Sequence, residues 1–250
     1  MLKTCQNDLV ALRAANQAAA RVLWEMIRII KPGMTAIQLD DRAADIMNEL
    51  GASSAPRLTE DFPGNTCISV NEVIAHGIPN HRVFRCGDFI NIDVSVEKDG
   101  FFGDVGYTFV LGQHRDPDLQ NLCRTARNIT LMAVKNSLPG KRLNEIGKII
   151  EDETRRNGYT VIRNLCSHGV GRCLHEHPVN ILNFYDPGED LVLEEGMVIA
   201  WEPYISTCAT RAVEVKGCEH ALTTHNRSHV AQFEHTVLVT GSKPEILTVI

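Results

Sequence analysis

The sequence predicts an α+β fold built from two related halves, each made of two helices followed by strands. Segments 31–51 and 138–158 share a layout of Pro-Gly, a polar link, an amphipathic helical pattern and a closing Gly. Each segment follows a longer helical pattern and precedes strand-rich sequence. If the repeat is real, halves of about 1–115 and 116–250 pack around a pseudo-twofold axis within one domain, 1–250. Their strands then merge into one sheet, and a cleft between the halves is a usual place for a site.

The spacing of apolar residues places the elements in order. Apolar residues recur at helical spacing from Asp8 to Ile30 and again from about Pro117 to Ser137. The two Pro-Gly segments supply the second helix of each half. Strands are expected in 66–74 and 88–111 of the first half, and in 159–170 and 190–249 of the second half. Two Pro-Gly helix starts can also arise by chance in any α/β protein, so that alternative stays open.

A hairpin is expected around the Asp-Gly pair at positions 99–100, which follows an alternating strand. If this pair forms a two-residue loop, Asp93 pairs with Gly106 and Asp104 pairs with Ser95. The two aspartates then project from one face as diagonal neighbours, about 7–8 Å apart at Cα. Carboxylates at that separation can reach a shared ion or bridge two ions. The alternative is a pair of solvent-facing aspartates.

Five polar residues stand among apolar neighbours in strand-like segments: Asp93, Asp104, His168, Glu202 and Glu234. Four buried carboxylates cannot stay ionised without partners, because desolvating each charge costs several kcal/mol. Two divalent cations would neutralise all four. An oxygen-rich set with one imidazole suits Co²⁺, Mn²⁺, Fe²⁺ or Zn²⁺. From the residues alone, Glu234 and Asp93 could bridge both ions. The alternative for each glutamate is an exposed residue at the edge of a sheet, which is the more common place for a lone glutamate in such a strand.

Composition excludes several other classes of protein. The net charge is −6 without a basic cluster, which argues against nucleic acid or an anionic membrane as the main partner. The start has no signal-peptide pattern, and Glu25 and Arg28 interrupt the longest apolar stretch near it. The eight cysteines form no C-x-x-C pair. We therefore expect reduced thiols and a cytoplasmic location.

Five blocks of sequence, taken together, resemble the type I methionine aminopeptidases: NEVIAHGIP, NIDVSVEKDGFFGD, SHGVGRCLHEHP, WEP and AQFEHT. They occur in the family's order and span nearly the whole chain. The resemblance implies the pita-bread fold, with a curved, mostly antiparallel sheet. It also implies that Asp93, Asp104, His168, Glu202 and Glu234 hold two divalent ions, with Asp104 and Glu234 as the bridging pair.

The resemblance further implies hydrolysis of the first peptide bond of a peptide or nascent protein, most often after methionine. His76 and His175 occupy the family's two catalytic histidine positions. His175 would hydrogen-bond the developing oxyanion, and His76 would contact the scissile nitrogen. Glu202, beside the nucleophilic water, would take its proton. A monomer with at most transient ribosome contact is expected.

The expected substrate pocket departs from the family's pattern. The residues expected to contact substrate are His76, His175, Cys67, Phe62, Leu174 and Trp201. Phe62 stands where a tyrosine is usual, and Leu174 replaces a phenylalanine. His220 falls where a tryptophan normally closes the pocket, and Trp201 is bulkier than the usual β-branched residue. The preferred first residue therefore stays open.

Three readings follow from these observations. The first is a methionine aminopeptidase. The second is a same-fold enzyme with another first-residue preference, or one related to the Xaa-Pro peptidases and creatinase-like hydrolases. Those relatives usually carry an extra N-terminal domain. The third is a non-catalytic binding protein, which we rank last because all five ligand residues are present.

Overall fold

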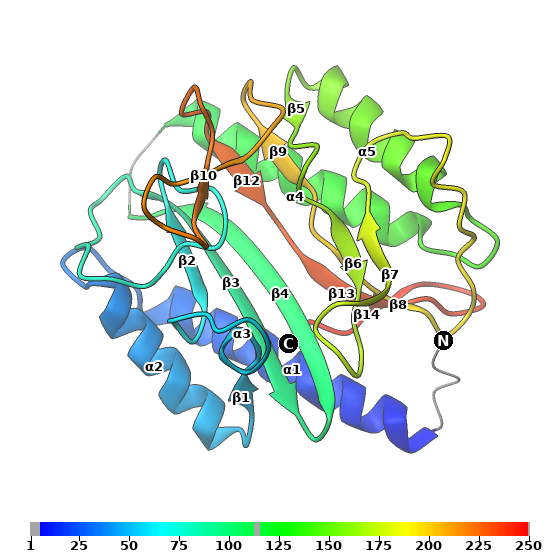
Figure 1. The fold of residues 1–250 in the computed structure, drawn as a ribbon, viewed down its shortest axis with the longest axis horizontal. Helices are drawn as coiled ribbons and strands as arrows, with labels where there is room; N and C mark the ends of the chain where they lie inside the picture. The colour runs from blue at the N-terminus through cyan, green and yellow to red at the C-terminus, as the bar shows by residue number, and fades with distance from the viewer. Residues whose placement is uncertain (1–5, 113–115, 250) are drawn as a thin grey trace.

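The computed structural model describes residues 6–112 and 116–249, and Figure 1 shows its ribbon. The first half contains α1 (Gln6–Ile29), α2 (Ala36–Glu49), β1 (Ser53–Ser54), α3 (Ala55–Thr59), β2 (Cys67–Val70), β3 (Phe89–Lys98) and β4 (Phe101–Val110). The second half begins with α4 (Pro117–Asn136), α5 (Leu143–Arg156), β5 (Thr160–Val161), β6 (Ser167–Gly169) and β7 (Glu176–Ile181). It continues with β8 (Val198–Trp201), β9 (Tyr204–Ser206), β10 (Val213–Glu214), β11 (Leu222–Thr223), β12 (Val230–Gln232), β13 (His235–Leu238) and β14 (Glu245–Ile246).

The two long helices and both Pro-Gly helices are confirmed, with small shifts at their ends. The expected boundary between the halves, at 115/116, touches residues 113–115, which lie outside the described ranges. Strand β7 was not predicted, because EHPVNI is polar and contains Pro178. Among the described strands it pairs with β6 alone, and a strand at the edge of a sheet tolerates proline.

The internal repeat extends to tertiary contacts. Helices α2 and α5 are each 14 residues long. Each is preceded by a glycine in the left-handed region, Gly33 at φ 93° and Gly140 at φ 86°, which favours glycine over other residues. The Gly33 N–H donates to the carbonyl of Phe84, and the Gly140 N–H donates to the carbonyl of Leu193, both at 2.9 Å. The two Pro-Gly segments therefore make equivalent backbone contacts, which supports the predicted repeat.

The described strand pairs are all antiparallel. In the first half, β3 pairs with β1, β2 and β4. In the second half, one sheet has the order β14-β13-β8-β6-β7 and another has the order β12-β9-β5, while β10 pairs with β11. The halves join where β4 meets the segment containing β12 and β13. There the Glu234 N–H donates to the Gly106 carbonyl at 2.9 Å, and the Thr236 hydroxyl donates to the Asp104 carbonyl at 2.8 Å.

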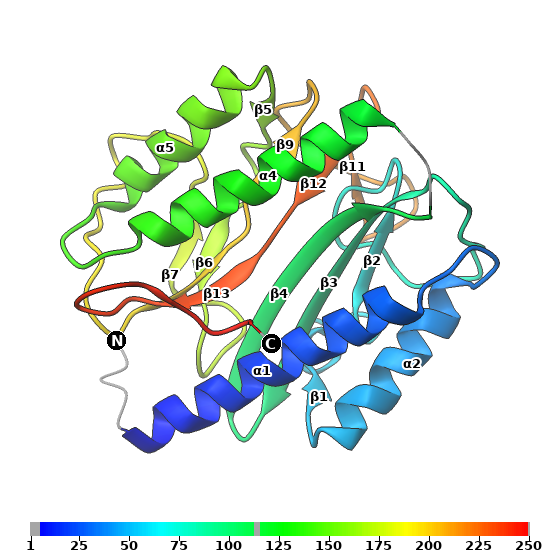
Figure 2. The ribbon, with the colours of Figure 1, turned by 180° about the vertical axis from the view of Figure 1, so that it is seen from behind.

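The four long helices lie on one side of the sheets (Figure 2). One core cluster packs α1 and α2 against the first-half strands and includes Leu23, Met26 and Ile92. A second cluster packs α4 and α5 against the second-half strands and includes Leu122 and Ile129. These two clusters place a large share of the apolar side chains between the helices and the sheets. Among the helices described, none is long and apolar enough to span a bilayer.

A buried carboxylate in α2 fixes the loop that leads into β2. Asp40 is 4% exposed and accepts hydrogen bonds from the backbone N–H groups of Asn65 and Thr66. It also accepts from the Asn65 amide and the Thr66 hydroxyl, at 2.9 and 2.7 Å. Because four donors converge on it, the hydrogen-bonding needs of this buried carboxylate are met within the protein. It therefore holds the start of β2 against α2.

Replacing Asp40 with Ala should lower the free energy of unfolding by about 2–4 kcal/mol, because buried donors lose their acceptor. Urea unfolding followed by circular dichroism measures this change. The exposed neighbour Asp41 provides the control, and D41A should change stability by less than about 0.5 kcal/mol. Equal losses in the two variants would contradict the role assigned to Asp40.

Candidate metal centre

The β3–β4 hairpin has the predicted register. Asp93 pairs with Gly106, and Ser95 pairs with Asp104. The turn residues at 99–100 both adopt positive φ, 54° and 79°, as a two-residue hairpin loop requires. The hairpin therefore presents both aspartates on one face of the sheet, towards the second half of the chain.

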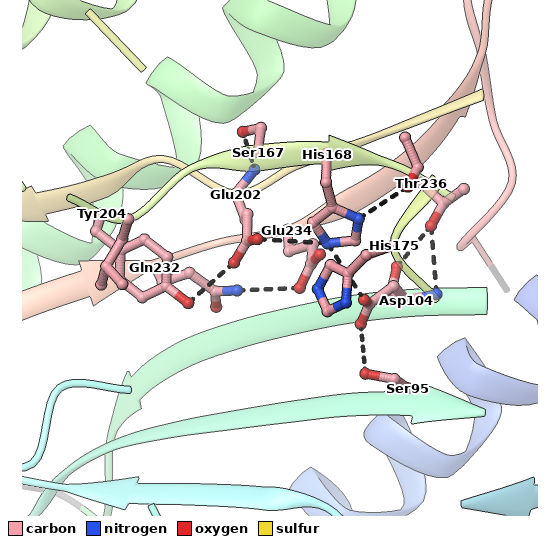
Figure 3. Close-up of polar contacts among 12 residues, drawn as sticks. Ser95, Asp104, Ser167, His168, His175, Glu202, Tyr204, Gln232, Glu234 and Thr236 are labelled. Atoms are coloured by element: carbon pink, nitrogen blue, oxygen red, sulfur yellow. Dashed lines mark hydrogen bonds and ion pairs between the residues drawn. The ribbon is translucent and has the colours of Figure 1, made fainter. Parts of the chain in front are cut away.

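The second half supplies the other three predicted ligands. His168 lies in β6, Glu202 directly follows β8, and Glu234 stands between β12 and β13. Figure 3 shows these side chains converging on Asp104. Ligand atoms of Asp104, His168 and Glu234 lie within 4.8 Å of one another, and so do those of Asp93, Glu202 and Glu234. The structure thus brings all five residues together in two groups that share Glu234.

Burial shifts the pKa of each carboxyl upward. Desolvation, followed by the charges of Asp104 and Glu202, raises the pKa of Asp93 well above its usual range. Desolvation and the charge of Asp104 raise the pKa of Glu202 to about 8. The pKa of Asp104 rises to about 6, with a hydrogen bond from Ser95 acting in the opposite direction. Glu234 is likewise raised well above its usual pKa. Nearby cations would reverse these shifts by favouring the ionised forms.

Two details indicate that the donor set fits divalent cations. Glu234 is 1% exposed, and its buried Oε1 has no hydrogen-bond partner among the described residues, which is costly unless another group satisfies it. His168 Nδ1 lies 3.1 Å from the Gly169 carbonyl. A proton on Nδ1 would leave the Nε2 lone pair facing Asp104 and Glu202, at 3.7 and 3.5 Å. An imidazole in that tautomer can bind a metal.

Other polar side chains hold the carboxylates in place. The Ser95 hydroxyl donates to Asp104 at 2.8 Å, the Tyr204 hydroxyl donates to Glu202 at 2.9 Å, and the Gln232 amide donates to Glu234 at 3.0 Å. These supporting roles were not predicted from the sequence. Tyr204 and Gln232 each lie two positions from the carboxylate they contact, so the period of two along a strand could have found them.

Both predicted catalytic histidines line a cavity of about 370 Å³ beside this cluster, together with His168, Glu202 and Tyr204. The ring of His175 lies 4.3 Å from the ring of His168, centroid to centroid. His76 has a φ of 50°, a strained value of the kind that gathers at functional sites. Burial lowers the pKa of both His76 and His175.

The expected substrate-pocket residues are only partly gathered at the site. Cys67 pairs with Asp93 across β2 and β3 and is buried. The Phe62 ring meets the His220 ring edge-on at 5.3 Å. Leu174 is 4% exposed and packs in an apolar cluster that includes Phe101. It is not among the residues that line the cavity.

Trp201 requires a correction, because it does not face the site. Its side chain is fully buried in the cluster beneath α4, and its indole N–H donates to the Ser137 hydroxyl at 2.7 Å. Side chains alternate along a strand, so Trp201 points towards the helices when Glu202 points towards the cavity. The expected contact between Trp201 and substrate is therefore wrong.

Comparisons with known proteins agree with this geometry. The family model described as "Metallopeptidase family M24" matches residues 10–241. A methionine aminopeptidase of Staphylococcus epidermidis is 46% identical over 99% of this chain and 98% of its own. Methionine aminopeptidase 2 of Bacillus subtilis is 43% identical over 99% of both chains. The crystal structure of methionine aminopeptidase from Rickettsia prowazekii, 33% identical, superposes over 100% of both chains with a TM-score of 0.94.

The fold and the buried cluster of metal-ligating side chains together are those of a metallopeptidase, a class of enzyme that needs bound metal. The chain belongs to metallopeptidase family M24, among the methionine aminopeptidases. The predicted resemblance and the predicted pita-bread fold are both confirmed.

Metal-free protein should lose stability as the pH rises from about 5 to about 8. The pKa values of Asp104, about 6, and Glu202, about 8, exceed the values near 4 expected for unfolded chains. The folded state therefore binds more protons than the unfolded state. This contribution to the free energy of unfolding is fully present below the pKa values of the unfolded chain. It is lost as the pH rises through the pKa values of the folded protein. Thermal unfolding of chelator-treated protein across this pH range measures it.

Adding Mn²⁺ at pH 8 should restore the melting temperature, because a cation favours the ionised carboxylates. The Glu234→Gln variant removes the negative charge that both ligand groups share, so Mn²⁺ should raise its melting temperature less than that of the wild type. A metal-free melting temperature that climbs between pH 5 and 8 would be inconsistent with these shifts.

Proposed function

We propose that this chain is a methionine aminopeptidase that hydrolyses the first peptide bond of peptides and nascent polypeptides. The observation that carries the proposal is the pair of ligand groups sharing Glu234, beside a cavity lined by His76 and His175. The relatives named methionine aminopeptidase, similar over nearly the full chain, support the same activity.

Two divalent ions, Co²⁺, Mn²⁺, Fe²⁺ or Zn²⁺, would be held by the five-residue cluster. Glu234, common to both groups, would bridge them. The resemblance assigns Asp104 as the second bridging residue, in place of Asp93. The ions would supply the Lewis acidity that activates a water molecule and polarises the scissile carbonyl.

The protein's own groups would carry out the proton transfers and orient the substrate. Glu202, fixed by the Tyr204 hydroxyl, would accept the proton of the attacking water and pass it to the leaving amine. His175 would donate a hydrogen bond to the developing oxyanion. His76, from the opposite half, would contact the scissile amide nitrogen.

A related enzyme with another first-residue preference is the second candidate. Phe62 and His220, two of the positions that depart from the family's pattern, contact each other. These two changed residues are therefore adjacent, which supports an altered pocket at this position. We further propose a cytoplasmic monomer that contacts the ribosome only transiently.

Release of the first residue from Met-Ala-Ser, Ala-Ala-Ser and Met-Pro-Ser peptides tests the proposal, with Mn²⁺, Fe²⁺, Co²⁺ or Zn²⁺ supplied to metal-stripped protein. Preferential release of methionine from Met-Ala-Ser, abolished by chelator, is the expected result. Faster cleavage of Ala-Ala-Ser would favour the second candidate. No cleavage of any peptide with any of the four metals would refute aminopeptidase activity.

The His175→Ala variant should lower kcat about 100-fold or more while changing KM only slightly, because an oxyanion donor acts mainly in the transition state. Steady-state kinetics on Met-Ala-Ser, at equal metal content, separates the two constants. His177→Ala, on a neighbouring exposed histidine, serves as the control. A change confined to KM would argue against the oxyanion role.

A further inference from the structure

A pair of buried amides links the metal centre to the first half of the chain. The Gln232 side chain donates from Nε2 to Oε2 of Glu234 at 3.0 Å (Figure 3). Its other terminal atom, Oε1, accepts from Nδ2 of Asn91 at 2.7 Å. Asn91 lies in β3 and Gln232 ends β12, so this contact crosses the junction between the halves. Asn91 is 6% exposed and belongs to neither ligand group.

Only one orientation of the Gln232 amide suits an ionised Glu234. A primary amide has a donor end and an acceptor end. With Nε2 towards Glu234 the amide stabilises the carboxylate, whereas with Oε1 in that place it would repel it. Gln232 is fully buried and lies against Gly106 of β4, where a Cβ would collide with both terminal atoms of the amide. A protein group, and not solvent, therefore sets the orientation.

The backbone fixes the direction of the hydrogen bonds that lead to this amide. The Gln232 carbonyl can only accept, so the Thr108 hydroxyl donates its single proton there, at 2.6 Å. The hydroxyl oxygen then accepts from the Gln232 N–H and from Nδ2 of Asn91, both at 3.1 Å. Because Thr108 has no further proton to donate, Asn91 must turn its donor end towards Thr108 and Gln232. Oε1 of Gln232 meets that donor, which leaves Nε2 for Glu234.

The sequence repeats the same spacing in the two halves. Asn91 stands two positions before Asp93, and Gln232 stands two positions before Glu234. Side chains two positions apart along an extended chain project from the same face. Each half therefore places one amide beside one carboxylate of the centre, and the contact between the two amides joins the two segments.

We propose that Asn91 is a positioning residue of the metal centre and acts through Gln232 on Glu234. This inference rests on the proposed function, in which Glu234 binds both cations. With its amide held by Asn91, Gln232 donates to Oε2 of Glu234. Oε1 of Glu234, which has no hydrogen-bond partner among the described residues, then stays available to a cation. Without Asn91, the Gln232 amide could reverse and present an oxygen to the carboxylate.

A double-mutant cycle tests this role. Calorimetry would measure the affinity of metal-stripped protein for Mn²⁺ in the wild type, Asn91→Leu, Gln232→Leu and the double variant. Leucine keeps the branched shape of asparagine and has no polar atoms. Asn144→Leu is the matched control, because Asn144 is similarly buried, at 7% exposed, but lies in α5 within the helix layer. Circular dichroism would confirm that each variant folds.

We expect N91L and Q232L each to weaken Mn²⁺ binding about 10- to 100-fold, the usual cost of losing a group that orients a metal ligand. The double variant should bind Mn²⁺ within about twofold of Q232L, because Asn91 then has no amide to orient. N144L should bind Mn²⁺ as the wild type does. If N91L does not fold, Asn91→Ala removes the same donor and replaces it in the cycle.

Wild-type Mn²⁺ affinity in N91L would overturn the proposal. So would a further tenfold loss when N91L is added to Q232L, because Asn91 would then act independently of Gln232. An equal loss in N144L would reduce the effect to general destabilisation and would also overturn it.

Failure of the aminopeptidase function itself is recognised separately. In that case the wild type binds Mn²⁺ but cleaves no peptide, and the cycle still reports on Asn91. A wild type that binds no Mn²⁺ would overturn this inference directly.

Discussion

Mutual repulsion among carboxylates in a desolvated cleft is the constraint on which this structure depends. The backbone holds these carboxylates close together, because the Glu234 N–H donates to the Gly106 carbonyl and so joins β4 to the neighbouring half. Hydrogen bonds from serine, tyrosine and glutamine side chains orient the carboxylates but cannot neutralise them. Divalent cations can neutralise them, and the Glu234 oxygen that lacks a hydrogen-bond partner in the described part of the chain lies where both ligand groups meet.

The duplicated architecture explains how so few elements build the centre. The first half contributes a hairpin whose two-residue turn sets the register, so both aspartates share one face. The second half contributes one residue from each of three strand segments. The helices pack on the other side of the sheets, so the polar face can carry chemistry without interrupting the core.

The sequence predicted elements and residues with strong local signals. The Asp-Gly turn predicted the hairpin register, in which Asp93 pairs with Gly106 and Asp104 pairs with Ser95. The Pro-Gly segments identified the repeated helices. Prediction failed where tertiary packing decides. Trp201 was placed in the substrate pocket although alternation with Glu202 directs it to the core. Strand β7 was not predicted because its polar sequence shows no regular alternation of apolar and polar residues.

The junction between the halves has a consequence for how the protein matures. Each ligand group combines an aspartate from the hairpin with Glu234, which is the last of the five to leave the ribosome. A partly synthesised chain that already displays the hairpin cannot assemble either group. On the proposed ligand assignment, metal acquisition follows translation through Glu234, so the enzyme stays inactive throughout most of its own synthesis.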